Sequence, residues 1–526
     1  MIKTDIKLPL DYSSDDIKAT VCAALPIKKD ELFDVVIIKR SLNLSDKARI
    51  HYDTTVALSL DGEREAGLLK MRKRVRACDI SRFKAAKYTP ALRPVIAGFG
   101  PAGMFAALTL AEAGARPIVI ERGEDIDARI KSVGRFFKCG ELNEKSNVQF
   151  GEGGAGTFSD GKLKVGTKDK YKYRILDELI EGGGSPEILY STTAHLGTDK
   201  LPQIVKHIRE KIISLGGEVR FNTTLTDIEI KDGALTSVTL DNGTPYKLNA
   251  NTLILALGHS ARDTVKMLYS KGLSIEPKGF GIGLRIEHKR EHINELIYGG
   301  GYDSALESAS YHLVEHLPSG RSVYSFCMCP GGTVVPSARE AFGVVTNGMS
   351  AYARDGENSN AAFLVSVTPK DFGGTALGGF DLQRELEERA YRAGGGGYFA
   401  PASRMEDFLN GEKSSCLGDV APTYPIGVTP ASHDSYLPEY ITSSIREAIP
   451  KMNDWLPGFY EADAVLTGVE TRSTSPIKML RKECFESVFI SGIYPVGEGA
   501  GYGGGIISSA YDGMRCADSI INNHKK

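Results

Sequence analysis

Residues 92–122 read LRPVIAGFGPAGMFAALTLAEAGARPIVIER, and this stretch decides the fold. An apolar run indicates a strand, and it ends in the spacing G-x-G-x-x-G at Gly98, Gly100 and Gly103. A helix pattern follows, and then a second apolar run that ends at Glu121. Strand, glycine turn, helix and strand within about 30 residues form a dinucleotide-binding βαβ unit. The stretch therefore predicts an α/β fold with a Rossmann-like domain.

Each residue type in this turn has a physical reason. Gly98 permits the tight turn, Gly100 lets the backbone approach a pyrophosphate, and Gly103 allows close packing of helix on strand. Pro101 and Ala102 begin the helix, whose N-terminal N–H groups and partial positive charge suit phosphates. We expect these five residues to bind the cofactor.

The second strand ends in Glu121 and Arg122, which we assign to the same site. A carboxylate at this position accepts hydrogen bonds from the ribose hydroxyls of an adenosine, and it repels a 2′-phosphate. The site is therefore expected to disfavour NADP.

The chain has 58 glycines among 526 residues, whereas average usage of about 7% would give roughly 37. An apolar content of 41% and a net charge of −2 exclude a fibrous or mostly disordered chain. Much of the surplus falls in three clusters at 98–103, 151–161 and 497–505. Glycine gathers where backbone approaches another group closely or takes positive φ, so the clusters are candidate cofactor contacts.

The middle cluster lies in VQFGEGGAGTFSDGKL, residues 148–163. We interpret Gly154 and Gly156 as backbone that faces a flavin and pyrophosphate, with Thr157 and Ser159 donating hydrogen bonds. The alternative is a flexible surface loop.

The third cluster lies in ISGIYPVGEGAGYGGGIISSAYDG, residues 490–513. It resembles the second flavin motif of FAD-dependent oxidoreductases, in which a strand, a glycine loop and a helix close the site. Glu498 stands where those proteins usually carry Asp. The dipole of the following helix would stabilise negative charge on the flavin. The residues expected at the flavin are Gly497, Glu498, Gly503, Gly504, Gly505 and Ile506.

Two further segments complete the expected FAD site. TLILALGHSARD, residues 252–263, resembles a third flavin motif, with Gly258 at the end of a strand. Leu225 lies in a strand-like segment over 219–230, where such folds place backbone against adenine. Together these signals predict FAD as the cofactor and no metal.

With these motifs in place, the chain resembles the bacterial family of uncharacterised FAD-dependent or NAD-utilising dehydrogenases, of the two-dinucleotide-binding-domain flavoprotein type. The resemblance covers nearly the whole length and includes GFGPAGMFAALTLAEAG, FGEGGAGTFSDGKL, ALGHSARDT, GVETRSTSPIKMLR and YPVGEGAGYGGGIISSAYDG. It implies a flavin fold and redox chemistry. NAD(P)H is then a candidate transient electron donor, since the flavin takes the well-formed dinucleotide motif.

The order of elements predicts four segments. Residues 1–88 form a small N-terminal α/β module, and 89–275 form the first segment of the FAD-binding domain. Residues 276–460 form an inserted α+β substrate domain, and 461–526 close the discontinuous FAD-binding domain.

Candidate catalytic residues are Arg472, Lys478 and His259. Arg472 and Lys478 precede the closing motif and could stabilise reduced flavin or bind an anionic substrate; the alternative is a scaffold loop with solvated charges. His259 could relay a proton, although its position in the sequence favours a structural histidine. Cys327 and Cys329 are read as ordinary free thiols, with a redox pair as the alternative.

The sequence-based prediction is a cytoplasmic FAD-dependent oxidoreductase of a small-molecule substrate. Sparse, scattered cysteines fit a reducing compartment, and residues 94–111 are read as strand, turn and helix, not as a membrane span. The net charge gives no drive toward nucleic acid. Two alternatives stay open: an RNA-modifying or RNA-binding flavoprotein that uses the basic tract 70–87, and a FAD-binding protein without turnover.

Overall fold

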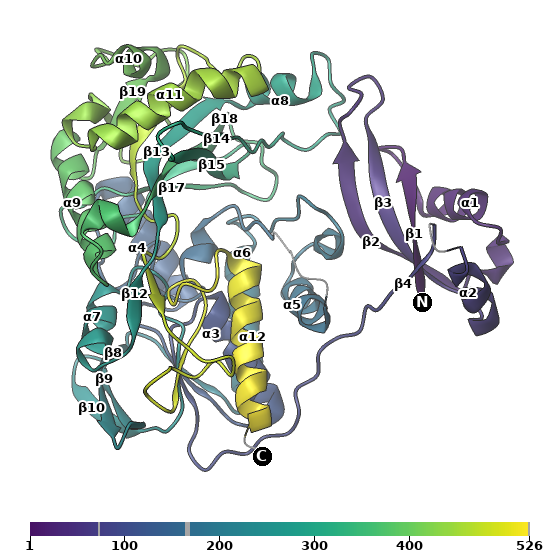
Figure 1. Ribbon diagram of the computed structural model, residues 1–526, viewed down its shortest axis with the longest axis horizontal. Helices are drawn as coiled ribbons and strands as arrows, with labels where there is room; N and C mark the ends of the chain where they lie inside the picture. Colours follow the sequence, from purple (N-terminus) through teal and green to yellow (C-terminus); the bar gives the residue numbers. More distant parts are fainter. Residues whose placement is uncertain (72–73, 164–168, 524–526) are drawn as a thin grey trace.

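The structure is a computed structural model that describes residues 1–71, 74–163 and 169–523. Figure 1 shows a large body with a small N-terminal module standing at its side. No helix in the described ranges is long and apolar enough to cross a membrane.

The N-terminal module is a four-stranded sheet in the order β2-β3-β1-β4, and its two helices lie on the side away from the body (Figure 1). Ser13 and Asp16 form a capping box at the start of the first helix. Leu42, Leu44 and Ile50 pack against the core of the body. The elements are β1 (Ile2–Leu8), α1 (Ser14–Ala24), β2 (Asp34–Asn43), β3 (His51–Ser59), α2 (Gly62–Leu69) and β4 (Arg76–Ala77).

The nucleotide-binding part is a five-stranded parallel sheet in the order β23-β11-β5-β6-β7. The first glycine motif joins β5 to α3 (Pro101–Ala113), which leads to β6, so the predicted Rossmann-like βαβ unit is confirmed. The closing helix α12 (Ile506–Asn523) packs along α3. The strands are β5 (Val95–Ala97), β6 (Ile118–Ile120), β7 (Glu218–Arg220), β11 (Leu253–Leu255) and β23 (Ile493–Pro495).

The expectation of one strand over 219–230 is wrong. Asn222 takes a left-handed φ of 50°, and the chain turns there between two sheets. β7 ends the parallel sheet, and β8 (Thr224–Lys231) begins an antiparallel sheet with β9 (Ala234–Asp241) and β10 (Pro245–Asn249).

The rest of the body is a seven-stranded sheet in the order β14-β15-β18-β13-β21-β19-β20. Helix α11 (Glu439–Trp455) lies across this sheet (Figure 1). The strands are β13 (Phe280–Lys289), β14 (Val314–His316), β15 (Ser322–Cys329), β18 (Asn358–Val367), β19 (Ala400–Arg404), β20 (Val428–Pro430) and β21 (Val465–Glu470). Because β21 pairs with β13, this sheet extends past residue 460, where the sequence placed the domain boundary.

Shorter elements connect these layers. The remaining helices are α4 (Ile126–Cys139), α5 (Lys170–Glu181), α6 (Leu201–Ser214), α7 (Arg262–Ser270), α8 (Arg290–Tyr298), α9 (Gly378–Ala393) and α10 (Met405–Asn410). Two strand pairs complete the body, β12 (Ile275–Pro277) with β22 (Ile477–Met479) and β16 (Thr333–Pro336) with β17 (Thr346–Met349).

Two buried histidines should make this fold acid-sensitive. Burial lowers the pKa of His288 and of His433 to about 4 in the folded protein. Since a free histidine has a pKa of about 6.5, protons bind the unfolded chain first as the pH falls. The stability that is present above this pH is therefore lost as the pH falls toward the folded-state pKa. We expect each histidine to cost about 2 kcal/mol of unfolding free energy at pH 5 relative to pH 7.

The measurement is urea unfolding at both pH values. His433→Gln should reduce the pH 7 to pH 5 loss, whereas substitution of the exposed His316 by Gln should leave it unchanged. An equal loss in wild type and His433→Gln would contradict the assignment.

Candidate functional site

A cavity of about 470 Å³ lies between the parallel sheet and the seven-stranded sheet. Segments from all three glycine clusters line one side of it, and β15, β17 and β21 contribute to the other. The predicted site residues on its wall are Gly98, Gly100, Pro101, Ala102, Glu121, Gly154, Gly156, Ser159, Gly258, His259, Arg472, Glu498, Gly504, Gly505 and Ile506.

A second pocket of about 30 Å³ adjoins this cavity and shares Gly98 and Glu121 with it. Arg122 and Leu225 line this small pocket. The Arg122 guanidinium stacks 4.4 Å from the centre of the Phe150 ring and pairs with Asp263 at 3.0 Å. Arg122 and Leu225, two of the residues predicted to bind the cofactor, therefore lie together beyond the first glycine turn.

Five predicted residues lie outside both linings: Gly103, Thr157, Gly497, Gly503 and Lys478. Gly103 packs helix on strand, since a Cβ there would lie 2.0 Å from the Gly98 carbonyl oxygen. Gly497 donates its N–H to Asp512 at 2.8 Å, behind the cavity wall. Lys478 is exposed, with its ammonium 5.2 Å from the centre of the Tyr502 ring.

The start of α3 is open to a ligand. Gly100 is the N-cap residue, and no side chain described in the structure caps this helix end. The first N–H groups of an uncapped helix need acceptors, and an anion supplies them.

Glu121 binds backbone groups of the protein to an extent that the sequence did not indicate. Its carboxylate accepts backbone N–H bonds from Phe99 at 2.9 Å and from Gly123 and Gly151 at 3.0 Å. It therefore ties the first glycine turn to the middle glycine cluster. A carboxylate has about four acceptor positions, so one stays available to a ribose hydroxyl.

The hydroxyls of the middle cluster are used within the loop. Thr157 donates to the Glu152 carbonyl at 3.4 Å, and Ser159 donates to the Gly156 carbonyl at 2.7 Å. The prediction that both hydroxyl groups donate to the cofactor is not supported in this geometry. What the loop presents to the cavity is mainly backbone.

His259 forms a polar pair with Glu498 on the cavity wall. The distance from His259 Nδ1 to Glu498 Oε1 is 3.2 Å. The other ring nitrogen, Nε2, is buried and has no hydrogen-bond partner among the described residues. The pair can hold a proton where a ligand would lie.

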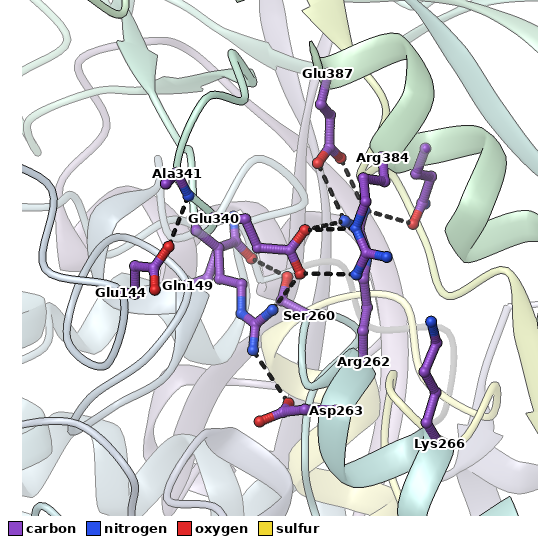
Figure 2. A network of polar contacts seen from close by, with 12 residues as sticks. Glu144, Gln149, Ser260, Arg262, Asp263, Lys266, Glu340, Ala341, Arg384 and Glu387 are labelled. Atoms are coloured by element: carbon purple, nitrogen blue, oxygen red, sulfur yellow. Dashed lines mark hydrogen bonds and ion pairs between the residues drawn. The ribbon is translucent and has the colours of Figure 1, made fainter.

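Arg472 reaches the cavity from a buried ion network. It forms two hydrogen bonds to Glu387, at 2.9 and 2.7 Å, and a third to Ser260 at 3.1 Å. Arg262 binds the same Glu387 carboxylate and also Glu340 (Figure 2). The network joins α7, α9 and the segment after β21, so it fixes one sheet against the other.

The network is a strongly ionised cluster. Burial alone would raise the pKa of Glu387, but the adjoining Arg262 and Arg472 guanidiniums outweigh it and lower the pKa to about 2. Arg472 is therefore held in place at the cavity wall by a carboxylate of opposite charge.

The sequence did not indicate the opposite wall of the cavity. Ser325, Phe326 and Cys327 of β15 and Glu470 of β21 lie there on the seven-stranded sheet, with Asn347 on β17 and with Ser310 and Tyr311 in the loop before β14. Cys327 was considered only as a thiol, and no local motif places any of these residues at the cavity.

The network should carry a large share of the stability. Glu387→Gln leaves two buried guanidiniums short of a negative charge, and we expect a loss of about 3–5 kcal/mol in unfolding free energy. Glu385→Gln is the control, because Glu385 is an exposed residue on the same helix that pairs with Arg389 on the surface. Chemical unfolding measures both, and a loss within about 1 kcal/mol of the control would contradict the network's importance.

Part of the chain matches a known protein family, and its fold is loosely similar to solved flavoprotein structures. Residues 279–473 match the family described as FAD-dependent protein, C-terminal domain-like. A glycine oxidase from Bacillus cereus is 13% identical, covering 83% of this chain and 96% of that one, with a TM-score of 0.33. A flavoprotein/dehydrogenase from Cytophaga hutchinsonii is 11% identical, covering 82% and 79%, with a TM-score of 0.36. These two likenesses are too loose to indicate a reaction.

The sequence match is much stronger. A protein of Clostridium beijerinckii, named only as uncharacterized, is 44% identical over 528 residues, which cover 98% of each chain. The protein therefore belongs to the same family as this clostridial chain.

Proposed function

We propose that the protein is an FAD-dependent oxidoreductase that binds FAD in the large cavity and acts on a small molecule there. One observation carries the proposal. Three glycine clusters that are far apart in sequence line a single cavity, together with the uncapped start of α3 and the start of α12. The match of residues 279–473 to the family described as FAD-dependent protein, C-terminal domain-like, supports the same proposal.

The residues fit the parts of FAD. Gly100 and Gly154 present bare backbone, and a Cβ on Gly100 would already lie 3.7 Å from Gly154 Cα. Both glycines line the cavity at the uncapped start of α3, and this position suits the pyrophosphate. The adenosine would lie toward the small pocket lined by Arg122 and Leu225, and the remaining acceptor position of Glu121 suits its ribose.

Bound flavin would supply the hydride or electron transfer. The protein itself would orient the substrate and would hold or transfer protons. The His259–Glu498 pair holds a proton at the cavity wall, Arg472 is fixed by Glu387, and the partial positive charge at the start of α12 favours negative charge nearby.

NADH or NADPH is the proposed class of electron donor, bound transiently. The RNA-directed alternative gains no support from the structure: Arg76 pairs with Asp5, and Arg82 pairs with Asp177. Arg72 and Lys73 of the same tract lie outside the described residues.

Gly100→Val tests the binding site. Its added methyl groups would fill the space at the start of α3, so we expect FAD binding to weaken at least roughly 100-fold, about 2.7 kcal/mol. Gly67→Val, in open space on α2, is the control. Flavin absorbance after reconstitution and gel filtration is the measurement, and a Gly100→Val protein with one FAD per chain would refute the site.

A second experiment tests whether NADH or NADPH reduces the bound flavin. Anaerobic mixing of the reconstituted protein with NADH or NADPH should bleach the visible flavin absorbance with at least one of them. Bound flavin that neither nucleotide reduces would contradict the proposed donor, and it would favour a binding protein without turnover.

A further inference from the structure

The cavity wall contains an irregular strand with two cysteines. Strand β15 pairs with β18, and its register shifts between Phe326 and Cys329. Cys327 lies in this bulge with a left-handed φ of 44°. Bulges of this kind re-aim a side chain and are common beside active sites, and a left-handed non-glycine residue is strained. At this bulge, Cys327 lines the cavity wall.

The two cysteines are free thiols that contact each other. A hydrogen bond from the Cys329 thiol holds the pKa of Cys327 well below the usual range of a thiol, although burial opposes it, and the positive charges of Lys162 and Arg285 add to the effect. Cys329 itself is fully buried behind the wall, with its Sγ 3.3 Å from the Cys327 carbonyl oxygen.

Ionic contacts hold this part of the wall in place. Arg285 donates to the Cys327 carbonyl at 3.0 Å, and it forms two hydrogen bonds to the buried Glu470, at 2.6 and 3.1 Å. Glu470 of β21 holds the Arg285 side chain in place, and Arg285 in turn holds the backbone of the bulge through the Cys327 carbonyl. A thiol positioned in this way is preorganised toward the cavity.

An independent observation points to a ligand at the same wall. Tyr311 lines the cavity and is only 9% exposed, yet its hydroxyl has no hydrogen-bond partner in the described part of the chain. A buried hydroxyl group without a partner is costly, so a bound molecule that supplies one is expected there.

We propose that Cys327 and Cys329 are a redox-active pair that exchanges two electrons with the flavin, which rests on the proposed function above. In the forward step the two thiols lose two electrons and two protons as a bond forms between Cys327 Sγ and Cys329 Sγ. Both electrons and one proton would pass to oxidised flavin, and the second proton would pass to solvent. The reverse step would reduce the disulfide. Cys327, which lines the cavity, is the cysteine that faces the flavin, and the buried Cys329 closes the disulfide with it.

The test counts electrons on the full-length, FAD-reconstituted protein. The protein is oxidised with diamide, freed of reagent and titrated anaerobically with dithionite while the flavin absorbance is followed. Wild type should take up about four electrons per bound flavin, and Cys327→Ser and Cys329→Ser about two each, because a disulfide and a flavin each accept two. Cys139→Ser, at an exposed position on α4, should match wild type.

Peptide mapping provides a readout that does not depend on the flavin. Trypsin releases both cysteines on one peptide, residues 322–339, which contains no other cysteine. After diamide, alkylation without reductant should leave this wild-type peptide unmodified and lighter by two hydrogens.

The outcomes separate the two proposals. Bound flavin with an uptake of about two electrons in diamide-treated wild type, or alkylation of both cysteines, would overturn the redox pair alone. A wild-type protein that takes no flavin would overturn the proposed function and the redox pair together.

Discussion

Backbone segments around the cavity pack at separations that no side chain could occupy. A Cβ on Gly98 would lie 2.2 Å from the Ala256 carbonyl oxygen, and one on Gly499 would lie 2.3 Å from that of Gly258. The first contact joins the glycine turn after β5 to the end of β11, and the second joins the end of β11 to the closing segment. Because contacts this short would force the backbone apart, the positions of α3 and α12 depend on glycine at these sites. The cavity follows from that packing.

Buried ions then fix the seven-stranded sheet over this backbone. The Glu387 carboxylate is shared by Arg262 and Arg472, and Arg354 of the inserted part pairs with Asp160 of the middle glycine cluster at 2.9 Å. Each pair joins elements that are distant in sequence. Such pairs are costly to break once buried, so they hold one relative position of the two sheets. The cavity between the sheets is thereby shaped before any ligand enters.

The parts of the structure that depend on local sequence could be predicted. The βαβ unit and the helix that begins at Ile506 follow from apolar periodicity and glycine spacing over short stretches. The break at Asn222 was missed because a polar residue in an extended pattern gives little warning of left-handed backbone. The Arg472–Glu387 pair and the position of Cys327 were beyond reach, since pairing across 85 residues and the β15–β18 register decide them.

A crystal structure of the FAD-reconstituted protein would show where the cofactor lies. We expect the pyrophosphate at the start of α3 beside Gly100, the adenine beside Leu225, and the isoalloxazine ring between the start of α12 and the wall that carries Cys327. Flavin density outside this cavity, or a ring that faces away from the seven-stranded sheet, would refute this binding site.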